Sequence, residues 1–149
     1  MRNLAIGFVL GVAVTIAGVI ALTTFYTGPA LIVKALAPAS AMLEGPVLIT
    51  IEATNPHDDP VMLNNVVVSN KFFQNLDIVA VRPSPLPDSP MDFFGSKIWY
   101  FEISVPPQEM RTIELDVVAK HPGTHVAEFS VCNSYMVCSQ IVVPIEFTE

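Results

Sequence analysis

The two cysteines of the chain, Cys132 and Cys138, are the residues best placed to do chemistry. Val131 and Ile141 fall on the inward phase of two successive expected strands, so both cysteines point outward. Opposed cysteines on one face of a hairpin can lie at disulfide distance. In an oxidising compartment we expect a disulfide that closes a small loop and contributes about 2 kcal/mol. Two free thiols are the alternative for a domain that faces the cytoplasm.

Two histidines, His121 and His125, could supplement these sulfurs in a copper or zinc site. A cupredoxin ends in a similar way, with a strand that ends in Cys and a loop that supplies His and Met. Here the loop after Cys132 has Tyr135 about where the histidine should be. The histidines also flank a turn, where imidazoles are usually solvated. A metal-binding module built on these residues is therefore the alternative, and we expect no bound metal or cofactor.

An acidic loop over residues 55–59 contains Asp58 and Asp59 beside Asn55 and His57. Calcium prefers hard oxygen ligands, and it needs several carboxylates at alternating loop positions. This loop offers two adjacent carboxylates between prolines, which is more typical of a solvated turn. Calcium binding at 55–59 belongs to the same alternative, an exported module for a metal or small ligand.

The proline-rich segment 82–95 is the most suggestive loop of the chain. Its prolines stiffen it toward polyproline II, so ordering it costs little further entropy. Its large apolar side chains either cover one end of the core or contact a partner or the membrane surface. The candidate contact residues are Pro85, Pro87, Met91, Phe93 and Phe94.

Catalytic motifs are missing from the sequence. It contains no nucleophile elbow, phosphate-binding glycine loop, zinc-protease helix or dinucleotide fingerprint. We therefore expect a protein that is not an enzyme.

Charge is scarce and unevenly distributed. Charged residues make up 14% of the 149 residues, against about 25% in a typical globular domain, and the net charge is −7. The 52% apolar content excludes intrinsic disorder, and the acidic balance argues against a nucleic-acid partner. Residues 1–40 contain only Arg2 and Lys34 as charged residues, so the deficit is concentrated at the N-terminus.

The stretch Leu4–Leu22 has Thr15 as its only polar side chain. As a helix it would be about 28 Å long, close to the thickness of the hydrocarbon core. We expect residues 1–26 to form a transmembrane signal anchor that contacts the lipid bilayer through residues 4–26. Arg2 before the run and acidic residues after it predict a cytoplasmic N-terminus and an extracytoplasmic domain. A cleaved signal peptide is the competing interpretation, and it exports the domain as well.

Residues 27–45 are expected to form a juxtamembrane linker. Pro29 is placed to begin a short apolar helix that Pro38 ends, on the membrane surface or against a partner subunit. An extension of the membrane helix past a kink at Pro29 is the alternative.

Residues 46–149 show a hydrophobic period of two, which is typical of strands with one buried face. Turn residues separate the runs, and no amphipathic helix lies between them. Seven strands in about a hundred residues predict an all-β fold, a β-sandwich. The expected strands lie near 47–53, 61–69, 75–82, 99–105, 112–117, 124–131 and 136–147.

Three turns carry a family resemblance: Asn55-Pro56, Pro106-Pro107 and Pro122-Gly123-Thr124. In these turns residues 45–147 resemble the immunoglobulin-like sandwiches of bacterial and archaeal cell-surface proteins, such as the CARDB-like, NEW3-like and DUF11-like domains. The resemblance implies a seven-stranded immunoglobulin-like β-sandwich and an adhesion or scaffolding role, without a defined ligand. We therefore expect an accessory subunit of a membrane or envelope complex, with other membrane or envelope subunits as partners.

Overall fold

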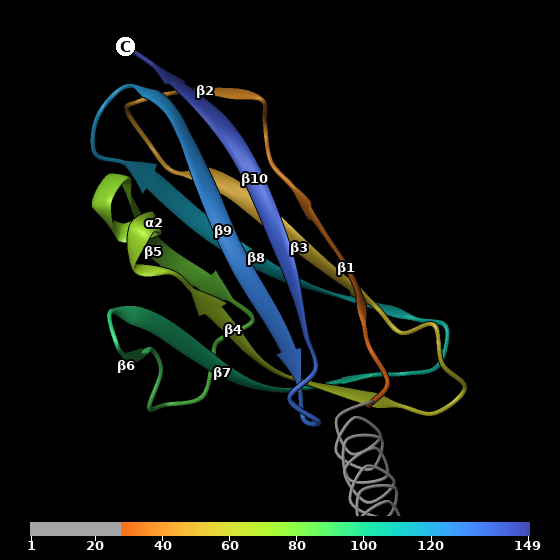
Figure 1. The fold of residues 1–149 in the computed structure, drawn as a ribbon. Coiled ribbons are helices and arrows are strands. Elements are labelled where there is room, and N and C mark those ends of the chain that lie inside the picture. The colour runs from red at the N-terminus through yellow and green to blue at the C-terminus, as the bar shows by residue number, and fades with distance from the viewer. Residues whose placement is uncertain (1–27) are drawn as a thin grey trace, which may run out of the picture.

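The computed structural model describes residues 28–149, which form two β-sheets packed face to face (Figure 1). In spatial order, the four-stranded sheet contains β1 (Ile32–Leu36), β3 (Val47–Thr54), β8 (Met110–Ala119) and β5 (Leu76–Arg82). The six-stranded sheet contains β2 (Ser40–Met42), β10 (Cys138–Thr148), β9 (Gly123–Asn133), β4 (Val61–Val68), β7 (Ser96–Val105) and β6 (Met91–Phe93). One short helix, α2 (Asn70–Asn75), connects β4 to β5.

The core lies between the sheets and follows from the alternation of apolar residues. In β3 every second side chain is buried, beginning with Val47, while Thr50 and Glu52 point outward and are half-buried. Phe72 of α2 lies against Phe129 of β9, with ring centroids 5.6 Å apart. The helix therefore closes one end of the core.

The all-β sandwich and its seven expected strands are confirmed, but ten strands are present in residues 28–149 rather than seven. The additional strands are β1, β2 and β6. Within the described residues, no helix has the length and apolarity needed to cross a membrane. The anchor expected over residues 1–26 lies outside them.

The prediction of a short helix between Pro29 and Pro38 is wrong. Residues 32–36 form strand β1, which pairs antiparallel with β3, and β2 pairs in parallel with β10. In β1, Val33 and Ala35 pack against the core while Ile32 and Leu36 are exposed. Because two of the three outward residues, Ile32 and Leu36, are apolar and only Lys34 is charged, the period of two is hidden in the sequence. The segment expected to be a linker thus adds two strands to the sandwich.

Asn55 fixes the turn after β3 and is fully buried. Its Nδ2 donates to the carbonyl oxygens of Asp59 and Val105, at 2.8 and 2.9 Å, and its Oδ1 accepts from the backbone N–H of His57. The Asn-Pro turn is therefore tied to the end of β7. This amide serves as a structural link, and its oxygen is already used by the turn.

We predict that Asn55→Ala lowers the free energy of unfolding by about 2–3 kcal/mol, because the buried carbonyl of Val105 and the partly buried carbonyl of Asp59 lose their donor. Asn70→Ala, at an exposed asparagine, is the control and should change stability little. Urea unfolding of both variants measures the difference. Equal stability of the two variants would contradict a structural role for Asn55.

Candidate functional site: an apolar groove on the six-stranded sheet

The β9–β10 hairpin carries the expected disulfide. Cys132 and Cys138 lie directly opposite each other in the antiparallel register, and their sulfurs are bonded at 2.04 Å. Within the hairpin, Asn133 Oδ1 accepts hydrogen bonds from the backbone N–H groups of Tyr135 and Val137. The loop between the cysteines is therefore closed covalently and held from inside.

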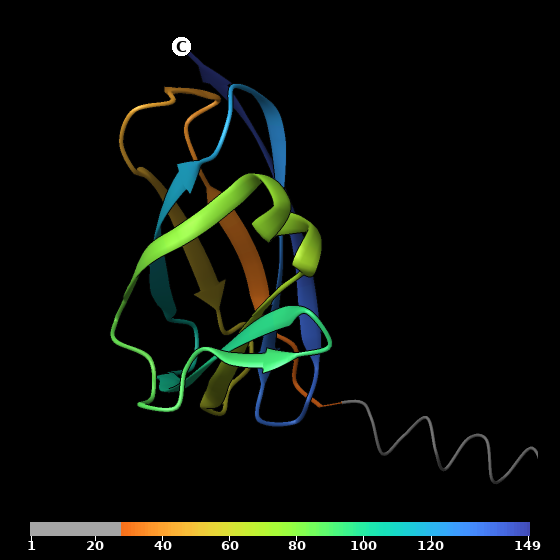
Figure 2. The same cartoon turned by 90° about the vertical axis from the view of Figure 1, so that its left-hand side faces the viewer.

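An apolar groove of about 320 Å³ lies on the outer face of this sheet. The disulfide and Met136 lie on one side, and Met91 and Phe93 of β6 lie on the other. Figure 2 shows the β6–β7 hairpin projecting to the same side as β9 and β10. The remaining lining residues come from β4 and β7, and they are Asn65, Val67, Ile98 and Tyr100. The groove therefore combines residues of five strands, β4, β6, β7, β9 and β10, and its described lining includes no charged side chain.

Phe93 and Phe94 do not cover the core. The interpretation that these two side chains of segment 82–95 close one end of the sandwich is therefore wrong. Phe93 is 54% exposed and Phe94 is 95% exposed, with ring centroids 4.7 Å apart. Phe94 and Gly95 both have positive φ, 47° and 82°, in a two-residue turn between β6 and β7. A bulky residue in this conformation costs about 1–2 kcal/mol. The fold thus holds an aromatic ring in solvent at a position where Asn or Gly would be more favourable.

The proline-rich loop that precedes β6 packs on its own domain. The backbone N–H of Leu86 donates to Tyr100 O at 2.8 Å, and Ser89 Oγ accepts from the backbone N–H of Tyr100 at 2.9 Å. The loop therefore covers part of the free edge of β7. Pro85 is half-buried and Pro87 is exposed. Of the expected contact residues, the structure brings Met91, Phe93 and Phe94 together and places Pro85 in a different cavity.

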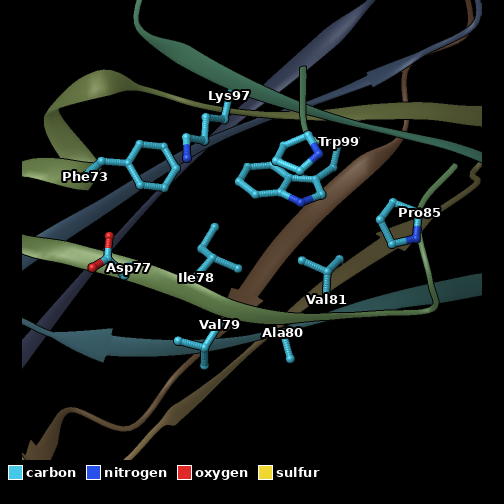
Figure 3. A pocket seen from close by; sticks show the side chains of 10 residues that line it. Phe73, Asp77, Ile78, Val79, Ala80, Val81, Pro85, Lys97 and Trp99 are labelled. Carbon is cyan, nitrogen blue, oxygen red and sulfur yellow. The ribbon is translucent and has the colours of Figure 1, made fainter. Parts of the chain in front are cut away.

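That second cavity is a cleft of about 370 Å³ between β5 and β7, with Pro85 at one end (Figure 3). Trp99 and Ile78 lie inside it, and Lys97 Nζ lies 5.0 Å from the centroid of the Phe73 ring. Asp77 lies at its rim and pairs with Lys120 at 3.3 Å. Trp99 is part of the buried core, and Ile78 packs against it. The cleft therefore opens into the core, at the edge where the two sheets separate.

The proposed metal ligands do not meet. His125 and Cys132 are both on β9, seven positions apart, which corresponds to about 24 Å along a strand. His125 Nε2 lies 2.8 Å from His121 O, and its ring lies beside that of Phe147. Both sulfurs are in the disulfide. Residues 28–149 contain no cluster of three or more His, Cys, Asp or Glu side chains that could hold a metal ion, and this includes the 55–59 loop.

The outer face of the four-stranded sheet is charged, in contrast to the groove. Arg82 pairs with Glu114 at 3.0 Å and with Asp116 at 2.8 Å. The hydrogen bonds from Arg82 hold the pKa of Asp116 below its ordinary value. Glu52 lies on the neighbouring strand and points to the same face. This face is suited to water, so the apolar groove distinguishes the six-stranded sheet.

The comparisons with known proteins define a fold and no family. No family model matches the chain, and no curated protein matches it. Among solved structures, a cohesin module from a Clostridium perfringens family 33 glycoside hydrolase is similar at TM-score 0.54 and 6% identity, over 82% of this chain and 99% of that one. Red sea bream transglutaminase is similar at TM-score 0.50 and 14% identity, over 83% of this chain but only 15% of its own length. The described chain is therefore a β-sandwich domain similar to immunoglobulin-like and cohesin folds.

We predict that Phe94→Asn raises the free energy of unfolding by about 0.5–1.5 kcal/mol, because Asn-Gly suits a turn with two positive φ angles. Phe93→Asn is the matched control. It should not stabilise the domain, because residue 93 is paired in β6. Chemical denaturation of both variants measures this. An unchanged or lower stability of Phe94→Asn would show that the ring contributes to folding and is not held in solvent at a cost.

Proposed function

We propose that this chain is a single-span membrane protein that displays its β-sandwich outside the cytoplasm and acts as an accessory subunit of a membrane or envelope complex. Its role is structural and based on protein interaction. The contact surface is the apolar groove together with Phe93 and Phe94. The observation that carries the proposal is the Phe94 ring, which is 95% exposed in a conformation unfavourable for its residue type.

The groove has the chemistry of a protein contact. Large exposed apolar side chains in a recess are typical of the anchor residues that dominate protein interfaces. Met91 adapts its shape to a partner more readily than branched residues do. The charged outer face of the other sheet, with Arg82, Glu114 and Asp116, remains free for water. A partner bound at the groove would therefore leave the sandwich with one wet face and one covered face.

Export and anchoring rest on the sequence and on the disulfide. The apolar run at 4–22 has the length of a membrane span, and Arg2 before it favours a cytoplasmic N-terminus. A structural disulfide is typical of proteins in an oxidising compartment outside the cytoplasm. Both features support a location of the sandwich outside the cytoplasm.

We predict that Phe93→Ser/Phe94→Ser weakens association at least about tenfold, because both anchor side chains are removed. The measurement is co-purification of partner subunits from native membranes in mild detergent, scored by quantitative mass spectrometry. The domain should remain folded, since neither ring lies in the core.

Leu48→Ser/Val79→Ser is the matched control, because it removes two exposed apolar side chains from the four-stranded sheet. It should leave association unchanged. If both double variants retain their partners equally, the groove is not the contact surface. If the Phe variant unfolds, the two rings belong to the fold.

A further inference from the structure

The first described residues are attached to the β9–β10 hairpin. A Cβ atom on Gly28 would lie 2.6 Å from Tyr135 Cβ, so the backbone passes directly against that side chain. Asn133 Nδ2 donates to Pro29 O, and Ser139 Oγ donates to Leu31 O at 3.0 Å. The chain therefore enters the sandwich at the tip of this hairpin. Figure 1 shows that this entry point lies at the end of the sandwich opposite the C-terminus.

The hairpin tip exposes two large side chains beside that point. Met136 is 81% exposed at φ 61°, and Tyr135 is exposed next to it. The tip, residues 134–137, has no charged residue, so moving it among lipid headgroups desolvates no charge. A tyrosine beside a flexible apolar side chain is the combination that favours the boundary between lipid and water.

The length of the tether limits which part of the sandwich can reach a bilayer. If residues 4–22 span the membrane, Leu22 is six residues from Gly28, and this stretch extends at most about 22 Å. Strand β10, with eleven residues, is about 37 Å long. Met42 lies beside Thr148 at the far end of that strand, so it is about one strand length from the membrane surface when the sandwich stands upright on the hairpin.

We propose that the tip of the β9–β10 hairpin rests in the bilayer interface, with Tyr135 and Met136 among the headgroups, and thereby orients the sandwich on the membrane. The occupant of this surface is a lipid surface. The inference rests on the proposed membrane anchor. The disulfide and the bonds of Asn133 hold the tip rigidly against Pro29, so the anchor and the lipid contact act together.

The native methionines provide the probes. The full chain with ¹³C-methyl methionine is placed in phosphatidylcholine nanodiscs, with and without a doxyl-labelled lipid, and Met136→Leu assigns the resonance. We expect the Met136 methyl signal to fall at least about two-fold with the paramagnetic lipid, because the side chain lies at the interface. The Met42 signal serves as the internal control and should be unchanged.

The outcomes separate the two proposals. If the chain does not incorporate into nanodiscs, the membrane anchor is refuted and the hairpin contact fails with it. If the chain incorporates and Met136 is affected no more than Met42, only the hairpin contact is overturned, and the sandwich hangs freely from its anchor.

Discussion

The attachment of residues 28–31 to the β9–β10 hairpin determines how the whole domain is presented. Asn133 is its centre, because one amide holds both the hairpin tip and the carbonyl of Pro29. The disulfide prevents this hairpin from opening, and His57 Nε2 lies 2.9 Å from Ala30 O on the other side. The chain therefore enters the sandwich at one fixed place, and residues 28–31, the hairpin tip and the groove keep a constant relation to one another.

The two outer faces of the sandwich differ in polarity, and we propose a different environment for each: water for the four-stranded sheet and a protein partner for the six-stranded sheet. Arg82, Glu114 and Asp116 form an ion-pair cluster on the four-stranded sheet, which suits contact with water. On the six-stranded sheet, Met136 and Phe93 flank an apolar groove beside the attachment point. The conformation of Phe94 costs stability without filling the core, which is expected where selection acts on contact with another molecule.

Sequence reasoning reached the main strands and the disulfide because both follow from a strict period of two. The outward phase of Cys132 and Cys138 was enough to predict their pairing. Strand β1 could not be predicted in this way, because apolar residues occupy both of its faces. Strand β6 could not be predicted either, because three paired residues are too few to show a pattern. The groove could be predicted only in part. Met91 and Phe93 lie two residues apart in the sequence, but Val67 comes from β4 and Met136 from the β9–β10 loop, which are far apart in the chain.

The central claim is that the sandwich is held outside the cytoplasm by the N-terminal segment of the same chain. The most direct test is the intact mass of the chain that remains in membranes after alkaline carbonate washing, measured without reducing agent. The account predicts retention of a chain that still contains the apolar run at 4–22 and has one disulfide. Release of a shortened chain, cleaved after the apolar run, would contradict the anchor. A retained, uncleaved chain with two free thiols would contradict display outside the cytoplasm.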